Sequence, residues 1–500
     1  MELVFQEQQM QYLEQLFHET LTQEQTVELV VPDSEADINR VVDSFGTMLV
    51  REKTTAPGSA SFTGGVKAGV LYVPEGETNP KLMEAYLPIT VRKDLESITQ
   101  ECRVQWDCSV KEVDARMLNG RKVLLRVGVS CRVAAFAPSQ ICLYDMEQPP
   151  KTLCLHRTNV PMTLTLDTGE KMVSINDEIN LPEQSEPIDR VLKVLFRMEQ
   201  GENKVVGNKA LFKGTVHLHT LYRGADGSLY PFDGELPFSQ YIELSQDWDE
   251  QEVQVQLALA NAEVEPDGQM ECRRLLVAIN LVAQCVVLGK RNVCYLSDAY
   301  DLEQELDAQW QSTRVLGRLD SQQFRDTLTG TMPVPANRVL DVWAYAQDVM
   351  QQRNGEELNL QYGATCNVLY YDETGILQGK IVRLNQTQTI TLASSASCKP
   401  MCSIESPVSC QGGAQPLLRC QMCLSADSFA QQELRAIVGG SLQPSRWSEE
   451  RPSLILRRVQ PEESLWSIAK SNRTTVQRLM EANELSTDVP PEGQMLLIPM

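Results

Sequence analysis

Alternating apolar and polar positions predict β-strands along most of this chain. Residues 123–129 alternate directly after Asn119-Gly120, a dipeptide that favours a tight hairpin turn. Residues 253–259 alternate in the same way, and Asp267-Gly268 then marks a further turn. Residues 64–72 combine β-branched side chains with glycines, which suits strands and bends rather than a helix. We therefore expect a multidomain, mainly β chain.

A repeated spacing divides this pattern into three stretches. An arginine precedes a tyrosine by 32 positions three times, in the pairs Arg40 and Tyr72, Arg190 and Tyr222, and Arg338 and Tyr370. The arginines recur at intervals of 150 and 148 residues. Solenoid repeats are much shorter, so each stretch should be a strand-rich domain of its own.

Two further segments have helical patterns, and they complete the predicted organisation. Residues 7–22 place apolar side chains at the spacing of one face of a short amphipathic helix, namely Met10, Tyr12, Leu13, Leu16 and Phe17. Residues 300–306 also favour a helix. The predicted segments are an N-terminal helical segment (1–28), a first β domain (29–137), a linker and second β domain (138–297), a linker helix and degenerate third β domain (298–440), a linker (441–455) and a small terminal domain (456–500).

The terminal domain has the order strand, helix, helix, strand. Residues 455–459 form a short strand-like run, and Ser464 is a suitable N-cap for a first helix. Thr474, with Gln477 three residues later, predicts a capping box that opens a second helix. Residues 494–499 read as the closing strand. This order predicts a small α+β domain after the three β domains.

The residues of this segment resemble a LysM domain. Its sequence contains V-x-P-x-x-S-L-W-S-I-A-K from Val459, an Ala-Asn pair that closes the second helix, and a final P-x-G-Q-x-L-x-I-P. In LysM domains that bind N-acetylglucosamine polymers, a shallow groove lies between the loop entering the first helix and the loop leaving the second. The resemblance therefore implies a docking or ligand groove at Pro461, Glu462, Glu463, Ser464, Leu465, Trp466, Asn483, Glu484 and Leu485.

Two features of this groove modify the expectation. The family usually has Gly-Asp where this chain has Glu462-Glu463, and the lost glycine and added charge disfavour sugar binding. For Leu465 and Trp466, packing in a very small core is the alternative to contact with a ligand, because small domains need their large apolar side chains.

Composition changes the picture by excluding some partners. The formal net charge is −22, and Lys and Arg occur in no cluster longer than a pair, which argues against nucleic acid and against an anionic membrane surface. No apolar run approaches the ~18 residues that a membrane span needs. The N-terminus has no basic and apolar signal pattern, so we expect a cytosolic protein whose 14 cysteines are reduced thiols.

The repeat also resembles a known family. L-P-x-x-x-x-x-I-x-R-V-L from Leu181, F-x-G-x-V-x-x-x-x-L-Y from Phe212 and E-L-P-F-S from Glu235 are similar to the SPOCS domain of endospore-forming bacteria. That domain occurs in several copies before a C-terminal LysM domain in SipL-type spore-coat morphogenetic proteins. The resemblance implies a scaffold in the mother-cell cytosol at the forespore surface. It would join an ATP-hydrolysing coat protein to the developing envelope, with the LysM domain as a protein-docking surface.

Signals for chemistry are few. The sequence has no G-x-x-x-x-G-K-[ST] loop and no G-x-G-x-x-G after a strand, so we expect no nucleotide cofactor. His217 and His219 could face a metal from one strand, but no third ligand is near in sequence, and a solvated polar strand face is the favoured alternative. Five cysteines have spacings that loosely suggest zinc: Cys398, Cys402, Cys410, Cys420 and Cys423.

Three function classes remain in competition. A non-enzymatic adaptor for coat assembly accounts for the acidic composition, the repeated β domains and the missing catalytic spacing. A peptidoglycan or N-acetylglucosamine-polymer binding protein accounts for the LysM-like segment alone. A cell-wall hydrolase with a LysM anchor needs a catalytic constellation, and none can be singled out in the sequence. We therefore expect an adaptor, with glycan binding as the alternative.

Overall fold

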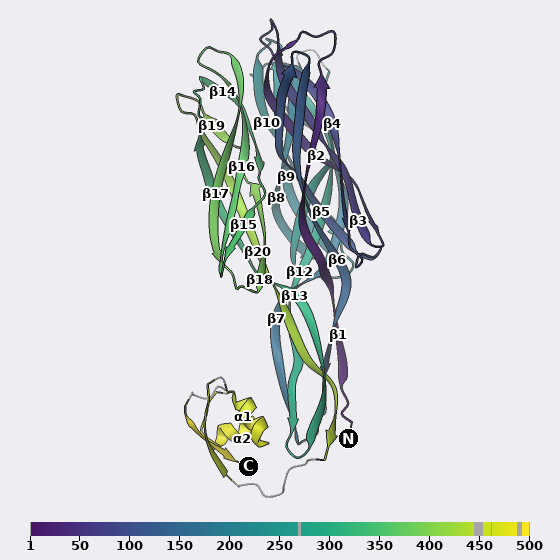
Figure 1. The fold of residues 1–500 in the computed structure, drawn as a ribbon. Coiled ribbons are helices and arrows are strands. Elements are labelled where there is room, and N and C mark those ends of the chain that lie inside the picture. Colours follow the sequence, from purple (N-terminus) through teal and green to yellow (C-terminus); the bar gives the residue numbers. More distant parts are fainter. Residues whose placement is uncertain (1, 269–271, 445–453, 462, 488–492, 500) are drawn as a thin grey trace.

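The computed structural model describes residues 2–268, 272–444, 454–461, 463–487 and 493–499. It contains three β units in chain order and a small terminal module (Figure 1). Unit 1 has strands β1 (Gln6–Val30), β2 (Ile38–Ala56), β3 (Ser59–Pro74), β4 (Lys81–Asp94), β5 (Arg103–Asn119) and β6 (Lys122–Asp145). Unit 2 has β7 (Leu153–Asn180), β8 (Ile188–Val206), β9 (Lys209–Gly224), β10 (Leu229–Glu243), β11 (Glu252–Pro266) and β12 (Arg274–Asp301).

Unit 3 and the terminal module follow. Unit 3 has β13 (Glu305–Thr331), β14 (Arg338–Ala346), β15 (Met350–Asn354), β16 (Glu357–Tyr371), β17 (Leu377–Thr391), β18 (Ala396–Ile404), β19 (Ser409–Gln411) and β20 (Leu417–Gln443). The terminal module has β21 (Leu454–Arg458), α1 (Leu465–Asn472), α2 (Val476–Ala482) and β22 (Met495–Pro499). The predicted fold class, a mainly β multidomain chain with a small α+β domain at its end, is confirmed.

Each unit is built from two antiparallel sheets. The first strand pairs with the last, giving β1-β6-β5, β7-β12-β11 and β13-β20-β18. The third strand of each order directly precedes the last strand in units 1 and 2, whereas in unit 3 both β18 and β19 pair with β20. The middle strands form the second sheet, in the orders β2-β3-β4 and β8-β9-β10, and in unit 3 β16 pairs with β14 and β15 on one side and β17 on the other. β7 and β13 also meet, at Thr163 and Arg318, so that the outer sheets of units 2 and 3 are continuous.

Strand alternation positions the core of each unit between its two sheets. In β6, Val123, Leu125, Val127 and Val129 point inward and are at most 2% exposed. They pack with side chains of β2, β3 and β4 in one apolar cluster, and comparable clusters fill units 2 and 3. The residues that alternate in the sequence are therefore the ones that the sheets bury.

The repeated 32-residue offset has a direct structural meaning. In each unit, the residue after the arginine lies directly opposite the tyrosine across the first pair of middle strands, as Val41 and Tyr72, Val191 and Tyr222, and Val339 and Tyr370. A β-bulge follows at once in all three, before Asp43, Lys193 and Asp341. The offset thus records the length of one hairpin that is built three times.

The predicted N-terminal helix is wrong. Residues 6–30 form β1, which pairs along its length with β6. Its burial alternates residue by residue after position 18, as expected for a strand with one face on a sheet. The apolar spacing near Tyr12 and Leu13, which suggested a helix, coincides with a register shift between Gln15 and Phe17. Pairing with a long neighbouring strand outweighs the weak local preference.

The predicted linker helix at 298–306 is also wrong. β12 continues to Asp301, and β13 begins at Glu305. The Asp301 carboxylate accepts hydrogen bonds from the backbone N–H groups of Glu303 (2.9 Å) and Gln304 (2.8 Å), which closes a tight turn instead. Likewise, residues 138–145, expected to begin a linker, are the end of β6. Of the expected linker 441–455, residues 445–453 lie outside the described residues.

The first and last strands of the units converge at one end of the molecule. β1, β7, β13 and β20 run beyond the sandwiches into a narrow end, where the two helices of the terminal module also lie (Figure 1). No helix within the described parts of the chain has the length and apolarity that a membrane crossing needs. The narrow end therefore positions the terminal module, and the middle sheets position a second site, at the centre of the three units.

Candidate functional site: the terminal module and the inter-unit network

Local capping explains where the two helices of the terminal module begin. The Ser464 hydroxyl accepts a hydrogen bond from the Ser467 N–H, and the Ser467 hydroxyl accepts one from the Ser464 N–H, both at 3.1 Å. This reciprocal arrangement is a capping box, and the prediction of Ser464 as N-cap is confirmed. The second N-cap is Thr475, one residue later than predicted, because Thr474 is buried and Thr475 accepts from the Arg478 N–H.

The predicted groove residues fall into three groups by burial. Leu465 is fully buried in the core of the module. Glu463, Trp466, Asn483 and Leu485 are half-buried, and Pro461, Ser464 and Glu484 are exposed. Glu462 lies outside the described residues. The two loops therefore offer few free polar groups, because the half-buried ones are engaged within the chain.

Glu463 is held inside the module. Its carboxylate forms an ion pair with Arg457 on β21 and accepts a hydrogen bond from the Gln460 N–H at 3.0 Å. Glu463, which stands where LysM domains usually have aspartate, therefore closes the turn at the start of the predicted groove.

Asn483 joins α2 to β22. Its side-chain amide donates to the carbonyl oxygens of Leu479 and Leu497, each at 2.7 Å, and its oxygen accepts from the Leu497 N–H at 2.6 Å. Every hydrogen bond of this side chain thus goes to the backbone of the module, which explains why an asparagine closes the second helix.

Trp466 packs against the narrow end of unit 2. Its indole N–H donates to Asp298 Oδ2 at 2.8 Å, and Lys470 on the same helix donates to Asp298 Oδ1 at 2.6 Å. The indole ring lies 4.9 Å from His156 and 4.8 Å from Tyr300, measured between ring centroids. Trp466 is therefore neither a core residue of the module alone nor a free ligand contact.

Tyr300 completes this contact. Its hydroxyl donates to the Thr474 carbonyl oxygen at 2.6 Å, its side chain belongs to the apolar cluster of the module, and burial raises its pKa. The end of β12 thus supplies one wall of the core of the terminal module.

Removing the Asp298 carboxylate should loosen the terminal module. Asp298→Ala removes the acceptor for both Trp466 and Lys470 while leaving the strand intact. We expect small-angle X-ray scattering to show a larger maximum dimension and a larger radius of gyration. Asp307→Ala, an exposed aspartate on β13, is the matched control and should leave the scattering profile unchanged. Identical profiles for the two variants would contradict the contact.

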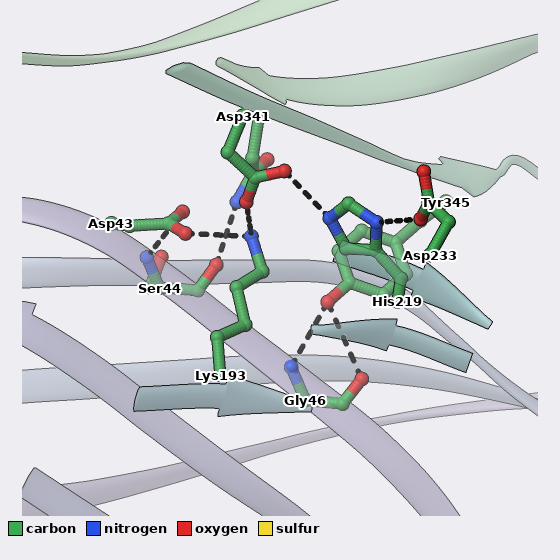
Figure 2. Close-up of polar contacts among 9 residues, drawn as sticks. Asp43, Ser44, Gly46, Lys193, His219, Asp233, Asp341 and Tyr345 are labelled. Carbon is green, nitrogen blue, oxygen red and sulfur yellow. Dashed lines mark hydrogen bonds and ion pairs between the residues drawn. The ribbon is translucent and has the colours of Figure 1, made fainter. Parts of the chain in front are cut away.

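A second constellation lies where the three units meet. Asp43, Lys193 and Asp341 each stand three residues after the repeated arginine, directly after the bulge. Lys193 Nζ lies 2.7 Å from Asp43 Oδ2 and 3.0 Å from Asp341 Oδ2 (Figure 2). The side chain of Lys193 is 1% exposed, that of Asp43 is 4% exposed and that of Asp341 is 0% exposed. Three units therefore contribute one equivalent position each to a buried ion triad.

His219 extends this network toward the surface. Its Nε2 lies 2.6 Å from Asp341 Oδ1 and its Nδ1 lies 2.6 Å from Asp233 Oδ1 (Figure 2). Burial alone would lower the pKa of His219, but the Asp341 charge and the hydrogen bonds to Asp233 and Asp341 raise it to about 9. The favoured alternative for His219, a solvated strand face, is wrong, because this side chain enters the contact between units.

Attraction between the opposite charges of the triad opposes the energetic cost of burying them. Burial would raise the pKa of Asp341, but Lys193 and His219 hold it below the usual range. Burial would lower the pKa of Lys193, but Asp341 and Asp43 raise it. Asp43 faces the Lys193 cation, but burial is the larger influence and raises its pKa. With His219 protonated, two cations therefore face two buried carboxylates.

This network predicts a loss of stability at alkaline pH. The groups that face His219 are Asp341 on β14, Asp233 on β10 and Lys193 on β8. Because the folded-state pKa of His219 is raised, its stabilisation is complete below the unfolded value near 6.5 and is lost as pH rises through about 9. The total effect is about 3 kcal/mol. Urea unfolding between these pH values should show the decline, and His219→Gln should flatten it.

His217→Gln is the matched control for this measurement. His217 lies two residues away on the same strand. Its Nε2 lies 2.7 Å from the exposed carboxylate of Glu199. The control should keep the decline between pH 6.5 and about 9. A decline that persists equally in His219→Gln would show that another group causes it.

A cleft of about 1410 Å³ opens beside the network and is lined by all three units. Most of its charged side chains are already paired with one another, as Arg132 with Asp107 and Arg325 with Glu405. The charges that line the cleft are therefore largely neutralised by one another.

The five cysteines considered for zinc lie on three strands of unit 3. Cys398 and Cys402 are on β18, Cys410 is on β19, and Cys420 and Cys423 are on β20. Within the described residues, no group of three or more His, Cys, Asp or Glu side chains is placed to hold a metal ion. All 14 cysteines are free thiols. Burial raises the pKa of Cys398 to about 11 and that of Cys420 to about 12.

Two family models match the chain. Residues 458–499 match the LysM domain, and residues 187–266 match the SipL, SPOCS domain. The second match spans β8 to β11 of unit 2. No curated protein and no solved structure matches the chain. The predicted resemblance to SipL-type proteins with a C-terminal LysM domain is confirmed, while membership of units 1 and 3 in the SPOCS family stays a prediction.

Proposed function

We propose that this chain, which joins a SipL SPOCS domain to a LysM domain, is a non-enzymatic scaffold for spore-envelope assembly. Its LysM domain docks a protein partner, a coat morphogenetic ATPase, and the three β units form the body that carries the docking module. The protein acts in the mother-cell cytosol at the forespore surface. The SPOCS and LysM matches support the sporulation-related binding role, and the geometry of the groove supports a protein partner.

The observation that carries this proposal is that polar side chains of the predicted groove are already ion-paired or hydrogen-bonded within the chain. A glycan presents hydroxyl and acetamido groups that need free hydrogen-bonding partners and an accessible aromatic face. Glu463 is paired with Arg457, Asn483 is bonded to the backbone, and the indole N–H of Trp466 is donated to Asp298. The groups best suited to a sugar are therefore occupied, which favours a broader protein contact.

The units also suit a scaffold. Ion pairs and apolar clusters join them at the centre, and the terminal module contacts the narrow end through Trp466 and Tyr300. A partner that binds the module is thereby held at a defined position relative to the three units.

A capture experiment from sporulating cells tests the proposal. The full chain and a chain ending at residue 444 are immobilised, and bound proteins are identified by mass spectrometry. We expect an ATPase of the coat to be enriched on the full chain at least about tenfold, a loss of about 1.4 kcal/mol or more in binding on truncation. Equal capture by both chains would place docking on the β units and overturn the role of the LysM domain.

Glycan binding is the second candidate function, because a LysM domain is matched at residues 458–499. It predicts that N-acetylglucosamine oligomers bind the full chain and compete with any protein captured through the module. A protein that is captured equally well in the presence of these oligomers favours the scaffold.

A further inference from the structure

The three units meet through equivalent faces. At the centre, one apolar cluster joins residues that occupy the same position in each unit. These sets are Val42, Leu192 and Leu340; Phe45, Leu195 and Trp343; and Leu71, Leu221 and Leu369. The middle strands therefore approach one another around an approximate threefold axis, in the manner of a symmetric trimer built within one chain.

The charged residues depart from this equivalence. At the position after the bulge, units 1 and 3 have Asp43 and Asp341, whereas unit 2 has Lys193. Lys193 Nζ lies within 3.0 Å of both carboxylates. The equivalent apolar side chains differ in size, as Phe45, Leu195 and Trp343 do, but this position distinguishes unit 2 from its neighbours by the sign of a buried charge.

We infer that Asp43, Lys193 and Asp341 form a charge code that allows only one cation-bearing face and two carboxylate-bearing faces to close around the axis. Three copies of the unit 2 face would bury three ammonium groups together, and three copies of a unit 1 or unit 3 face would bury three carboxylates. Burial of unpaired like charges is strongly unfavourable. The triad thus selects partners by excluding identical faces, which an apolar contact cannot do.

The order of the units supplies this combination of charges within one chain. Short turns connect the units, since β6 ends at Asp145 and β7 begins at Leu153, and β12 ends at Asp301 and β13 begins at Glu305. Unit 2 therefore always has one carboxylate-bearing neighbour on either side. A second copy of the chain satisfies the code only when it replaces a unit by a face of the same charge, so a measurement of molecular mass distinguishes closure within one chain from such an exchange.

His219 makes the two carboxylate positions, 43 and 341, unequal. It contacts Asp341 at 2.6 Å but has no counterpart at the equivalent positions, which are Gly69 in unit 1 and Asn367 in unit 3. A cation moved to position 43 would keep Asp341 beside His219. A cation moved to position 341 would remove the carboxylate that pairs with His219 Nε2 and would place an ammonium group beside the imidazole instead.

Permuting the charges tests this inference in the full chain. Lys193→Asp leaves three buried carboxylates and should lower the urea midpoint of unfolding sharply. Adding Asp43→Lys restores one cation and two carboxylates at the same three positions, and it should recover more than half of the lost midpoint. Adding Asp341→Lys to Lys193→Asp restores the same count beside His219, and it should recover clearly less. Light scattering in the same samples reports whether each variant is monomeric.

Each result of these measurements either supports the charge code or overturns it. Recovery by Asp43→Lys with a monomeric product supports the code, because neither single change is favourable alone. A double variant that is as unstable as the sum of its single variants would overturn it, since Lys193 would then be needed at that one site. A Lys193→Asp variant that stays monomeric with an unchanged midpoint would overturn it as well.

Discussion

Replacing Lys193 by methionine is expected to lower the free energy of unfolding by about 3–5 kcal/mol. Among the described residues, Lys193 is the only cation within hydrogen-bonding distance of Asp43, and it shares Asp341 with His219. Its removal leaves two carboxylates in a site where both are at most 4% exposed. One of them must take up a proton or draw in water, and either change weakens the contact between units.

Urea unfolding of the purified full chain measures this loss. Lys93→Met is the matched control, because Lys93 pairs with Glu19 at the surface, where the two side chains are 26% and 41% exposed. The control should change the free energy of unfolding by no more than about 1 kcal/mol. If both variants lose the same amount, the buried triad contributes no more than a surface ion pair, which would contradict its role in joining the units.

Asp167→Ala should destabilise the chain by a similar amount, about 3–5 kcal/mol, through the contact between units 1 and 2. The Asp167 side chain is 1% exposed and lies 2.6 Å from an Arg103 guanidinium nitrogen of unit 1. It also accepts from the Ser245 N–H and hydroxyl, at 2.7 and 2.6 Å, and from the Trp248 indole at 3.1 Å. Burial would raise its pKa, but these donors lower it. Truncation leaves all of them without their acceptor.

The matched control and the pH dependence sharpen this prediction. Asp94→Ala removes a 69% exposed carboxylate and should change stability by no more than about 0.5 kcal/mol. Because the folded-state pKa of Asp167 is lowered, its contribution is present above the unfolded value of about 3.9 and is lost as pH falls below it. The two variants should therefore differ most at neutral pH, and a difference that does not shrink toward pH 3 would contradict the role of this carboxylate.

The sequence predicts the strands well because their signal is local. The alternation at 123–129 and the turn at Asn119-Gly120 appear as β6 and its hairpin. Ser464 is found as an N-cap because a capping box spans only four residues. In the same way, the 32-residue offset corresponds to one hairpin, whose length any bulge or insertion would change.

Long-range pairing explains what the sequence did not show. β1 is a strand because it pairs with β6. Even the two partners that are nearest in sequence, Val30 and Lys122, are more than 90 positions apart. The triad joins residues that are 150 and 148 positions apart. The repeated Arg-Val before each of these residues was the available signal, because equal spacing from a shared anchor places side chains at equivalent points of a repeated fold.

The contact of the terminal module with β12 had no such signal. Trp466 and Asp298 stand in segments with unrelated patterns, and only the narrow end formed by the long strands brings them together. The groove residues themselves were found by resemblance, but their engagement by Arg457, by backbone groups and by Asp298 depends on the folded module.

Titration of chitotetraose into the full chain, followed by isothermal calorimetry, tests most directly whether the LysM domain docks a protein rather than a glycan. With Glu463, Asn483 and Trp466 engaged within the chain, we expect no saturable heat at millimolar sugar, a binding free energy weaker than about −4 kcal/mol. Saturable micromolar binding that disappears in Trp466→Ala would contradict this account and establish the groove as a sugar site.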